Sequence, residues 1–339
     1  MAPEPPPFAQ STYWDERFTK NPSAFDWLQP ANCLDGPILD ALQHATSHGN
    51  PRPRLLHIGC GTSVLSLHIR SHVPDPRQVH NTDFSRVAIQ LGARWEREVF
   101  EPERTAQEAS ESSEGKGKAP NPDSAPPPPP PQQEPSGTDA NARLDIRNDG
   151  ADHPPRMRWT TLDLLSLPEI RALGGPYAVV VDKSTCDAIS CGDDVVVPLP
   201  HPLQLAAAAS GSSSPSSSLP ATPVPASAVR VHPLHILALH LASVVSAGGR
   251  WIALSYSGHR FPFFEPFPAR VEEGRLDAEV LARGFVHPGR LWRLERREMV
   301  EVEEEGGAGG GAGTVVHRPK TAHWVYVMVR TEVEVNVKA

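Results

Sequence analysis

Short apolar runs recur along the chain, separated by polar or turn-forming residues. The run Tyr177–Val181 is apolar at almost every position, which is typical of a strand buried on both faces of a parallel sheet. We expect further strands over Arg54–Ile58, Val79–Thr82 and Arg250–Ser255. A strand followed by a turn is expected over Met157–Leu164.

Between these runs, the apolar residues take a helical spacing. Val87, Leu91 and Trp95 recur every four residues, which predicts a helix that begins near Ser85 and ends near Phe100. The hydroxyl of Ser85 suits the first position of such a helix, because it can accept a hydrogen bond from a backbone N–H of the first turn. A shorter helix is expected directly after the glycine-rich turn that follows the first strand.

The C-terminal half continues the alternation of helices and strands. Val231–Val245 has helical spacing and is expected to end at Gly248 and Gly249. Leu291–Val302 and His323–Arg330 are separated by a glycine-rich stretch and predict an antiparallel hairpin. Strands that alternate with helices and close on a hairpin predict a doubly wound α/β sheet with one antiparallel strand.

Proline usage divides the chain into packed and unpacked stretches. Residues 101–155 contain 12 of the 38 prolines, including the run Pro126–Pro131. Such a composition cannot bury enough apolar surface to offset the chain entropy lost on folding. We expect low-complexity insertions at about 101–155 and 206–228 and a glycine-rich loop at about 301–314. The remainder has the size of one α/β domain, so a single domain is expected over residues 1–339.

Charge and cysteine usage exclude several classes of partner. The net charge of −8 argues against nucleic acid, which binds basic surfaces. The four cysteines show no CxxC pair and no zinc spacing, so we expect no metal. No apolar run approaches the roughly 18 residues of a membrane helix, and the N-terminal residues lack a secretory pattern. We therefore expect a cytoplasmic protein without a membrane partner.

A Gly-x-Gly turn follows the first predicted strand. Gly59 and Gly61 lie where open α/β sheets bind ligands, although a plain tight turn would use the same residues. Asp83 ends the second predicted strand, where a carboxylate can accept from both ribose hydroxyls. The third glycine of a dinucleotide fingerprint would fall at Val64. A cofactor with a ribose and no pyrophosphate, such as S-adenosylmethionine, therefore fits better than a nicotinamide dinucleotide.

Three more carboxylates follow predicted strands. Asp163 can accept from an adenine amino group with Leu164 over the ring, or can cap a turn or helix. Asp182 lies where the methionine end of the cofactor and the substrate would meet, unless it is a solvated strand-end carboxylate. Asp187 either orients a substrate amine or caps the next helix.

The N-terminal residues are dense in aromatic side chains. The motifs YWDERF (Tyr13–Phe18) and FDWL (Phe25–Leu28) precede the first predicted strand. They can form a lid whose rings stack on a ligand while Arg17 reaches a carboxylate. They can equally form an amphipathic helix that seals the end of the sheet.

Together these motifs resemble the class I methyltransferase-like lysine methyltransferases that modify elongation factor 1-alpha. The resemblance runs from Tyr13 to Arg330 and rests on LLHIGCGTSVLS, NTDFSRVAI, TTLDLL, VVVDKSTCDAI, GGRWIALSYS and the two N-terminal motifs. It implies an α/β fold with a Rossmann-like, seven-stranded sheet that is mostly parallel, ends in an antiparallel hairpin and is flanked by helices. Ser184 stands where relatives often carry Gly, and Cys186 where they often carry Leu.

The resemblance also implies roles for individual residues. S-adenosyl-L-methionine would be bound by Trp14, Arg17, Gly59, Cys60, Gly61, Asp83, Phe84, Asp163, Leu164 and Asp182. Lys183 and Thr185 would lie beside its reactive end, and Asp182 and Asp187 are the predicted catalytic residues. The expected substrate is a protein lysine, with a translation elongation factor as one candidate. Two alternatives stay open: a nicotinamide-dependent oxidoreductase on a related sheet, and a non-catalytic binding module that uses its proline-rich loop.

Overall fold

The computed structural model describes residues 6–102, 145–146, 154–206, 227–264, 275–301 and 322–338. Most of the three predicted insertions, including Pro126–Pro131, lies outside these residues. Among the described residues, no helix combines the length and the apolar character that crossing a membrane requires.

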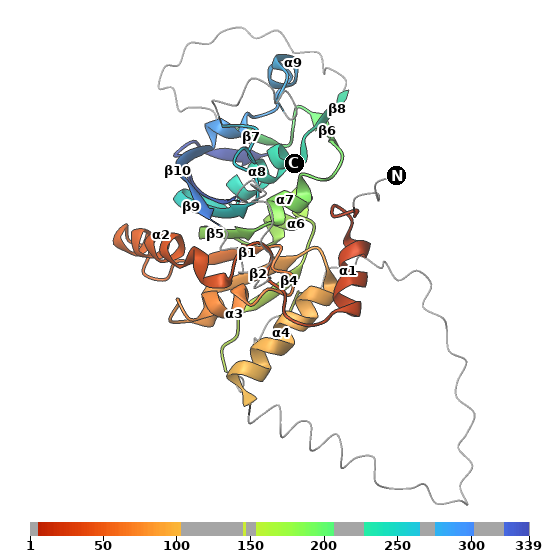
Figure 1. Cartoon of the computed structure of the whole chain (residues 1–339). Helices are drawn as coiled ribbons and strands as arrows, with labels where there is room; N and C mark the ends of the chain where they lie inside the picture. The colour runs from red at the N-terminus through yellow and green to blue at the C-terminus, as the bar shows by residue number, and fades with distance from the viewer. Residues whose placement is uncertain are drawn as a thin grey trace, which may run out of the picture.

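A sheet of eight strands runs through the molecule in the order β10-β11-β9-β5-β1-β2-β4-β3 (Figure 1). In that order the strands span Trp292–Glu301, Ala322–Arg330, Val245–Ser255, Tyr177–Lys183, Leu55–Ile58, Val79–Asp83, Arg158–Thr161 and Asp145–Ile146. The five strands from β9 to β4 are parallel to one another. Strands β10 and β11 form an antiparallel hairpin beside β9. The predicted fold class, with its C-terminal hairpin, is therefore confirmed.

The sheet has one strand more than the predicted seven. Strand β3 lies inside the predicted insertion 101–155 and pairs antiparallel with β4, with Asp145 opposite Thr160 and Ile146 opposite Trp159. The hydroxyl of Thr160 also donates to Asp145 Oδ1 at 3.1 Å. A strand of two residues offers no alternation to detect, and the composition of the surrounding stretch conceals it. The expected insertion at about 101–155 therefore contains a short strand at these two residues.

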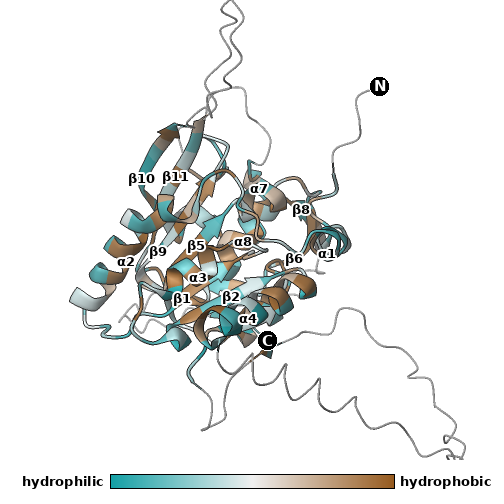
Figure 2. Cartoon of the chain, turned by 60° about the horizontal axis from the view of Figure 1, so that its bottom comes forward, coloured by the Kyte–Doolittle hydropathy of each residue, from teal (hydrophilic) through white to brown (hydrophobic). Residues whose placement is uncertain are grey.

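Helices cover both faces of the sheet. Neighbouring residues of a strand point to opposite faces, so Leu55 and Leu56 of β1 belong to different cores. The core around Leu55 includes residues of α2 (Asp35–Ser47), α3 (Leu65–Arg70) and α4 (Arg86–Phe100). The core around Leu56 includes residues of α6 (Leu167–Ala172), α7 (Thr185–Ile189) and α8 (Pro233–Ala242). Figure 2 shows the hydrophobic colour on β1, while α2 carries both colours.

Smaller elements complete the fold. Two further α-helices are α1 (Ser11–Lys20) and α9 (Ala278–Ala282), and the 3₁₀ helices are η1 (Ala31–Leu34), η2 (Pro76–Gln78) and η3 (Pro288–Arg290). Two small sheets have two strands each. One pairs β6 (Val195–Leu199) with β8 (Ser227–Val231), and the other pairs β7 (Leu203–Leu205) with β12 (Val335–Val337). Strand β8 begins two residues inside the predicted insertion 206–228, which therefore ends earlier than expected.

Two predicted helices have different outcomes. Helix α4 begins after Ser85, whose hydroxyl accepts from the Ala88 N–H at 3.2 Å, as predicted. Helix α8 ends at Ala242, before the predicted end at Gly248 and Gly249. Both glycines lie within β9, where the pairing with β5 is irregular and Gly248 has φ +72°. Glycine inside a strand marks such an irregularity as readily as it ends a helix.

Candidate functional site

The carboxyl ends of four neighbouring strands bring most of the predicted site residues together. In the register of the sheet, Ile58 of β1 lies between Asp182 of β5 and Thr82 of β2. The next position of β2, Asp83, lies opposite Thr161 of β4. Figure 1 shows β5, β1, β2 and β4 in this succession. The Gly59–Gly61 turn, Asp83, Asp163 and Asp182 therefore belong to one edge of the sheet, where α/β folds bind ligands.

The two glycines of the turn are required for different reasons. Gly59 has φ +55° and Gly61 has φ +51°, a region that side chains with a Cβ rarely adopt. A Cβ on Gly59 would lie 2.1 Å from the hydroxyl oxygen of Thr185. That hydroxyl donates to the carbonyl of Ile58 at 3.0 Å and ties α7 to the end of β1. A Cβ on Gly61 would meet only the ring of Phe18, at 3.4 Å.

Asp83 is held by two backbone groups. Its Oδ2 accepts from the Gly61 N–H at 2.7 Å, and its Oδ1 accepts from the Ser85 N–H at 2.7 Å. Burial raises the pKa of Asp83 to about 6. The hydrogen bonds from the two backbone N–H groups oppose this rise, because they stabilise the ionised carboxylate. The carboxylate is fixed in position by the turn on one side and by the start of α4 on the other.

Asp15 anchors the N-terminal helix at the same edge. Its Oδ1 accepts from the Ser85 hydroxyl at 2.5 Å and from the Val87 N–H at 3.3 Å. Phe18, one turn later on α1, packs with Ala88 of α4. Asp15 was not among the predicted site residues, although it lies inside the YWDERF motif. Its contact with the start of α4 shows why an acid is needed there.

Aromatic side chains of the N-terminal residues gather around α1. The ring of Trp14 stacks on Phe18 at 5.6 Å between centroids, and its indole N–H donates to the carbonyl of Phe8 at 2.7 Å. The guanidinium of Arg17 lies 5.0 Å from the ring of Phe25 and 5.2 Å from that of Trp27. Within the described residues Arg17 has no ion-pair partner, and its contact with a ligand stays a prediction. The segment is helical and lies beside the Gly61 turn.

Lys183 binds the N-terminal segment that contains Asp26, Trp27 and Gln29 to the carboxyl edge of the sheet. Its ammonium pairs with Asp26 at 2.9 Å and donates to the carbonyls of Trp27 at 2.9 Å and Gln29 at 3.3 Å. Burial lowers the pKa of Lys183, while Asp26 opposes that effect. The Ser63 hydroxyl also donates to Asp26. Lys183 was expected beside the reactive end, but its ion pair with Asp26 was not predicted, because the two residues lie far apart in the sequence.

Both carboxylate oxygens of Asp83 accept hydrogen bonds, whereas only one oxygen of Asp182 does so among the described residues. Its Oδ1 accepts from the Thr185 N–H at 2.9 Å and from the Cys186 N–H at 3.2 Å. Its Oδ2 is buried and has no hydrogen-bond partner among the described residues. Burial first, and then the charge of Asp187, raise the pKa of Asp182 to about 7. A buried carboxylate oxygen without a partner is energetically costly, and a hydrogen-bond donor or a cation placed beside it would stabilise it.

Asp187 is engaged with several groups of the protein. Its Oδ1 lies 2.7 Å from Arg260 Nε and accepts from the Ser255 hydroxyl at 2.5 Å. Its Oδ2 accepts from the Tyr256 N–H at 3.2 Å. Burial raises the pKa of Asp187, and Arg260 opposes this. The carboxylate therefore joins the first turn of α7 to the end of β9, and Arg260 is a partner that sequence analysis missed.

The remaining predicted contacts lie around the end of β4 and the turn after β1. Asp163 is half-buried, and its Oδ1 accepts from the Leu165 N–H at 2.8 Å, so one oxygen caps a turn. Leu164 is buried, whereas Phe84 is 38% exposed. Cys60 is buried and its N–H donates to the carbonyl of Thr82 at 2.9 Å. Burial raises the pKa of Asp163 and takes that of Cys60 well above its ordinary value.

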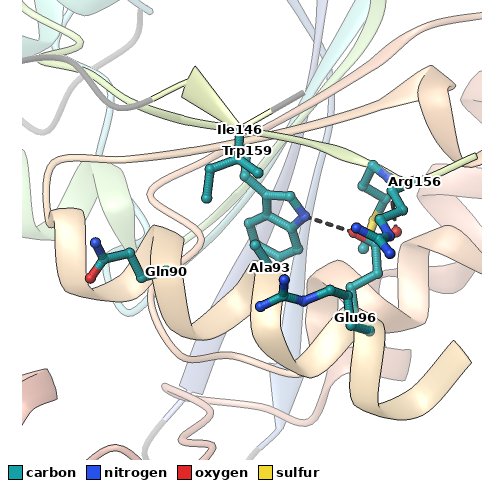
Figure 3. Close-up of a pocket in the computed structure, with 8 residues that line it drawn as sticks. Gln90, Ala93, Glu96, Ile146, Arg156 and Trp159 are labelled. Carbon is teal, nitrogen blue, oxygen red and sulfur yellow. Dashed lines mark hydrogen bonds between the residues drawn. The ribbon is translucent and has the colours of Figure 1, made fainter. Parts of the chain in front are cut away.

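A separate hollow lies between α4 and the strands β3 and β4 (Figure 3). It is lined by residues of α4, β3 and β4, including Gln90, Ala93, Ile146 and Trp159. The indole of Trp159 donates to Glu96 Oε2 at 2.8 Å, the bond drawn in the figure. Its lining includes Arg156 and Met157, which directly precede β4, so it lies away from the strand ends that carry Asp83 and Asp182. It contains none of the predicted site residues.

Comparison with known proteins finds relatives among methyltransferases. The chain is 27% identical over 213 residues to the methyltransferase srdJ of Neurospora crassa, covering 62% of this chain and 66% of the relative. It is 35% identical over 83 residues to an eEF1A lysine and N-terminal methyltransferase homolog of Drosophila pseudoobscura pseudoobscura, covering 24% of this chain and 11% of the relative. The chain thus spans less than two thirds of either relative. No protein-family model matches it.

Solved structures resemble the chain only loosely. A crystal structure of a SAM-dependent methyltransferase from Anabaena variabilis aligns with 97% of this chain and 96% of its own at 11% identity, with a TM-score of 0.41, which is too low to support an argument. The sheet order and the two sequence matches carry more weight. They confirm the resemblance to class I methyltransferases that the motifs indicated. The roles of individual site residues stay predictions.

Proposed function

We propose that the protein transfers a methyl group from S-adenosylmethionine to a lysine amine of a protein. The observation that carries this proposal is the arrangement at one sheet edge of the Gly59–Gly61 turn, a backbone-held Asp83 and a buried Asp182 with one oxygen left over. Two relatives named methyltransferase support the activity.

The edge fits the adenosine part of this cofactor. Each oxygen of Asp83 accepts one backbone N–H, and a carboxylate oxygen has a second lone pair for a ribose hydroxyl. Gly61 leaves open the space that a Cβ would fill beside Phe18. Asp163 and Leu164 would hold the adenine, with the exposed ring of Phe84 beside them. Val64, half-exposed at the start of α3, stands where a pyrophosphate-binding turn would carry glycine.

Asp182 is assigned to the reactive end. Its buried Oδ2 would accept from the amine that enters or face a cationic group, and a nearby cation would lower the pKa of Asp182. Asp187, the other predicted catalytic residue, would act through its contacts with Arg260 and Ser255, because both of its oxygens are already engaged. We propose Asp187 as a positioning residue.

The chemistry needs positioning more than activation. The neutral amine attacks the methyl carbon of the sulfonium, the carbon–sulfur bond breaks, and S-adenosylhomocysteine leaves with the bonding electrons. The lysine must first lose its ammonium proton to water, because an ordinary lysine with a pKa near 10.4 is almost wholly charged at neutral pH. Burial of the side chain at this edge would lower the pKa of the lysine and favour the neutral form.

One of the two relatives supports a protein amine as the acceptor. The match to the eEF1A methyltransferase homolog covers a quarter of this chain, and that relative's name includes lysine and N-terminal methylation. Tyr256, at the end of β9 beside Asp187, is 55% exposed and could line an entry for a side chain. Elongation factor 1-alpha is the first substrate to test, and such a substrate would agree with a cytoplasmic location.

Calorimetry tests the cofactor. The full chain is titrated with S-adenosylmethionine, with S-adenosylhomocysteine and, as a control, with reduced nicotinamide adenine dinucleotide. We expect micromolar binding of the two sulfur nucleosides and none of the dinucleotide. Binding of the dinucleotide alone would support the oxidoreductase alternative, and absence of all three at millimolar concentration would overturn the proposal.

A labelling experiment tests the acceptor. The protein is incubated with tritiated cofactor and a lysate, and separately with purified elongation factor 1-alpha, and labelled proteins are mapped by mass spectrometry. We expect label on lysine side chains. Label confined to an N-terminal amine or to small molecules would keep the methyltransferase activity and refute the lysine substrate.

A further inference from the structure

Two histidines and an aspartate from different elements meet at one place between α2 and α3. His68 lies on α3, and His72 follows the end of that helix within the same helical turn, since its N–H donates to Ile69 at 3.0 Å. Asp35 is the first residue of α2. One ligand atom from each of the three side chains lies within 4.8 Å of the other two.

The side chains are aimed at a common point. Nε2 of His68 lies 2.5 Å from Asp35 Oδ1, and Nε2 of His72 lies 3.0 Å from the same oxygen. Residues four apart on a helix share one face, so the two imidazoles reach Asp35 from the same side. Their ring planes cross at 86°, which separates the nitrogens instead of stacking the rings. The three side chains are 14% to 33% exposed, so the cluster is open to solvent.

From this geometry we propose that Asp35, His68 and His72 form a zinc site. Two imidazole nitrogens and a carboxylate oxygen are a donor set that Zn²⁺ takes in proteins, with water as the fourth ligand. Donor atoms around a tetrahedral zinc lie about 3.3 Å apart, given bonds of about 2.0 to 2.1 Å. The distances of 2.5 and 3.0 Å from the two nitrogens to Asp35 Oδ1 are shorter than this, and an outward shift of the partly exposed Asp35 side chain would lengthen both.

The position of the cluster in the fold agrees with a structural role. The site would join the start of α2 to the end of α3 on the face that carries the core around Leu55. It lies outside the proposed cofactor residues, so a zinc ion here would stabilise the fold and take no part in methyl transfer.

The sequence led us to expect no metal, because the four cysteines show no zinc spacing. The cluster is not visible in the sequence, because Asp35 lies 33 residues before His68. The spacing of His68 and His72 alone would not have been sufficient. A second pair with the same spacing, His44 on α2 and His48 directly after its end, has its rings 4.0 Å apart and belongs to no potential metal-ligand cluster among the described residues. That pair provides a matched control within the same chain.

The test uses the full chain without a histidine tag, freed of metal by a chelator. Zn²⁺ binding is measured by calorimetry, and Co²⁺ binding by its visible absorption, which reports coordination geometry. We expect one ion per chain and a melting temperature that rises with Zn²⁺. The double variant His68→Gln/His72→Gln should bind at least roughly 100-fold more weakly, whereas His44→Gln/His48→Gln should bind like the wild type.

A conservative variant distinguishes loss of a zinc ligand from loss of folding. Asp35→Asn removes the anionic ligand and keeps a carbonyl oxygen, and we expect binding roughly 10-fold weaker with an unchanged circular dichroism spectrum. Equal Zn²⁺ affinity in the wild type, Asp35→Asn and the His68/His72 variant would overturn the proposal. Loss of binding in the His44/His48 control, or no Zn²⁺ binding to the wild type below millimolar concentration, would do so as well. None of these readouts involves the methyl donor.

Discussion

The ends of β2 and β5 both carry a buried aspartate, yet the two are held in opposite ways. Asp83 has a backbone N–H on each oxygen. Asp182 has two backbone N–H groups on Oδ1 and no partner on Oδ2 among the described residues. Burial raises the pKa of both, to about 6 for Asp83 and to about 7 for Asp182.

The difference separates binding from reaction. A carboxylate with both oxygens fixed presents its remaining lone pairs in set directions, which suits a ribose whose two hydroxyls must be matched together. A carboxylate with one unengaged buried oxygen is costly without a ligand and gains most when a donor or a cation arrives. Asp83 is thus suited to a cofactor group that stays in place, and Asp182 to one that changes during turnover.

Removing Asp83 should have the largest effect. Asp83→Ala deletes the acceptor for two charge-assisted hydrogen bonds to the ribose, so we expect a loss of about 4 kcal/mol, or roughly a thousandfold in affinity for S-adenosylhomocysteine. Calorimetry measures this. The control is Asp75→Ala, which breaks an ion pair with Arg77 just before the opposite end of β2. An affinity of Asp83→Ala within tenfold of the wild type would contradict the ribose assignment.

Asp182 should instead govern the pH dependence of stability. With a pKa of about 7 in the folded chain and 3.8 as its ordinary value, Asp182 keeps a proton on folding that the unfolded chain has released. Stability therefore falls as pH rises between these values, by about 3 kcal/mol from pH 5 to pH 8. Asp182→Asn should remove that fall. The measurement is urea unfolding of the cofactor-free chain at both pH values.

The same variant separates the two aspartates. Asp182→Asn should abolish most methyl transfer while S-adenosylhomocysteine binds within about tenfold of the wild type, since Asn keeps the oxygen that Thr185 and Cys186 contact. If it lost cofactor binding as completely as Asp83→Ala, the two strand ends would have one role and the distinction drawn above would be wrong. A pH dependence of stability identical to that of the wild type would show that Asp182 titrates normally.

The glycines of the turn should give a smaller effect. In Gly59→Ala the new Cβ meets the Thr185 hydroxyl at 2.1 Å, and φ is positive, so we expect a loss of about 2 kcal/mol in the free energy of unfolding. Gly61→Ala is the matched variant, with the same sign of φ but more space, and should lose about 1 kcal/mol. Denaturant unfolding compares them. Equal losses would mean that backbone strain outweighs the contact with Thr185.

Much of this edge could be predicted from the sequence, for a physical reason. Strand ends are marked locally by an apolar run followed by a turn, so the positions of Gly59, Asp83 and Asp182 could be assigned without the structure. Asp15, Asp26 and Arg260 could not, because each contacts a site residue far away in sequence. Strand β3 was not predicted for a related reason, because its two residues form a strand by pairing with β4.

The smallest predicted effect concerns the backbone beside Asp182. Ser184 has φ +69°, its hydroxyl is buried without a hydrogen-bond partner among the described residues, and relatives were expected to carry glycine there. Ser184→Gly relieves both costs and should stabilise the chain by about 0.5 to 1 kcal/mol, less the entropy that glycine adds to the unfolded state. Unfolding in urea measures this, with Ser190→Gly on a residue of ordinary φ as the control. Stabilisation in Ser184→Gly with unchanged methyl transfer would show that the strain at the end of β5 does not help to position Asp182. Stabilisation with slower methyl transfer would show that the backbone strain at Ser184 helps to position Asp182. The end of β2, which carries Asp83, has no residue with such strain.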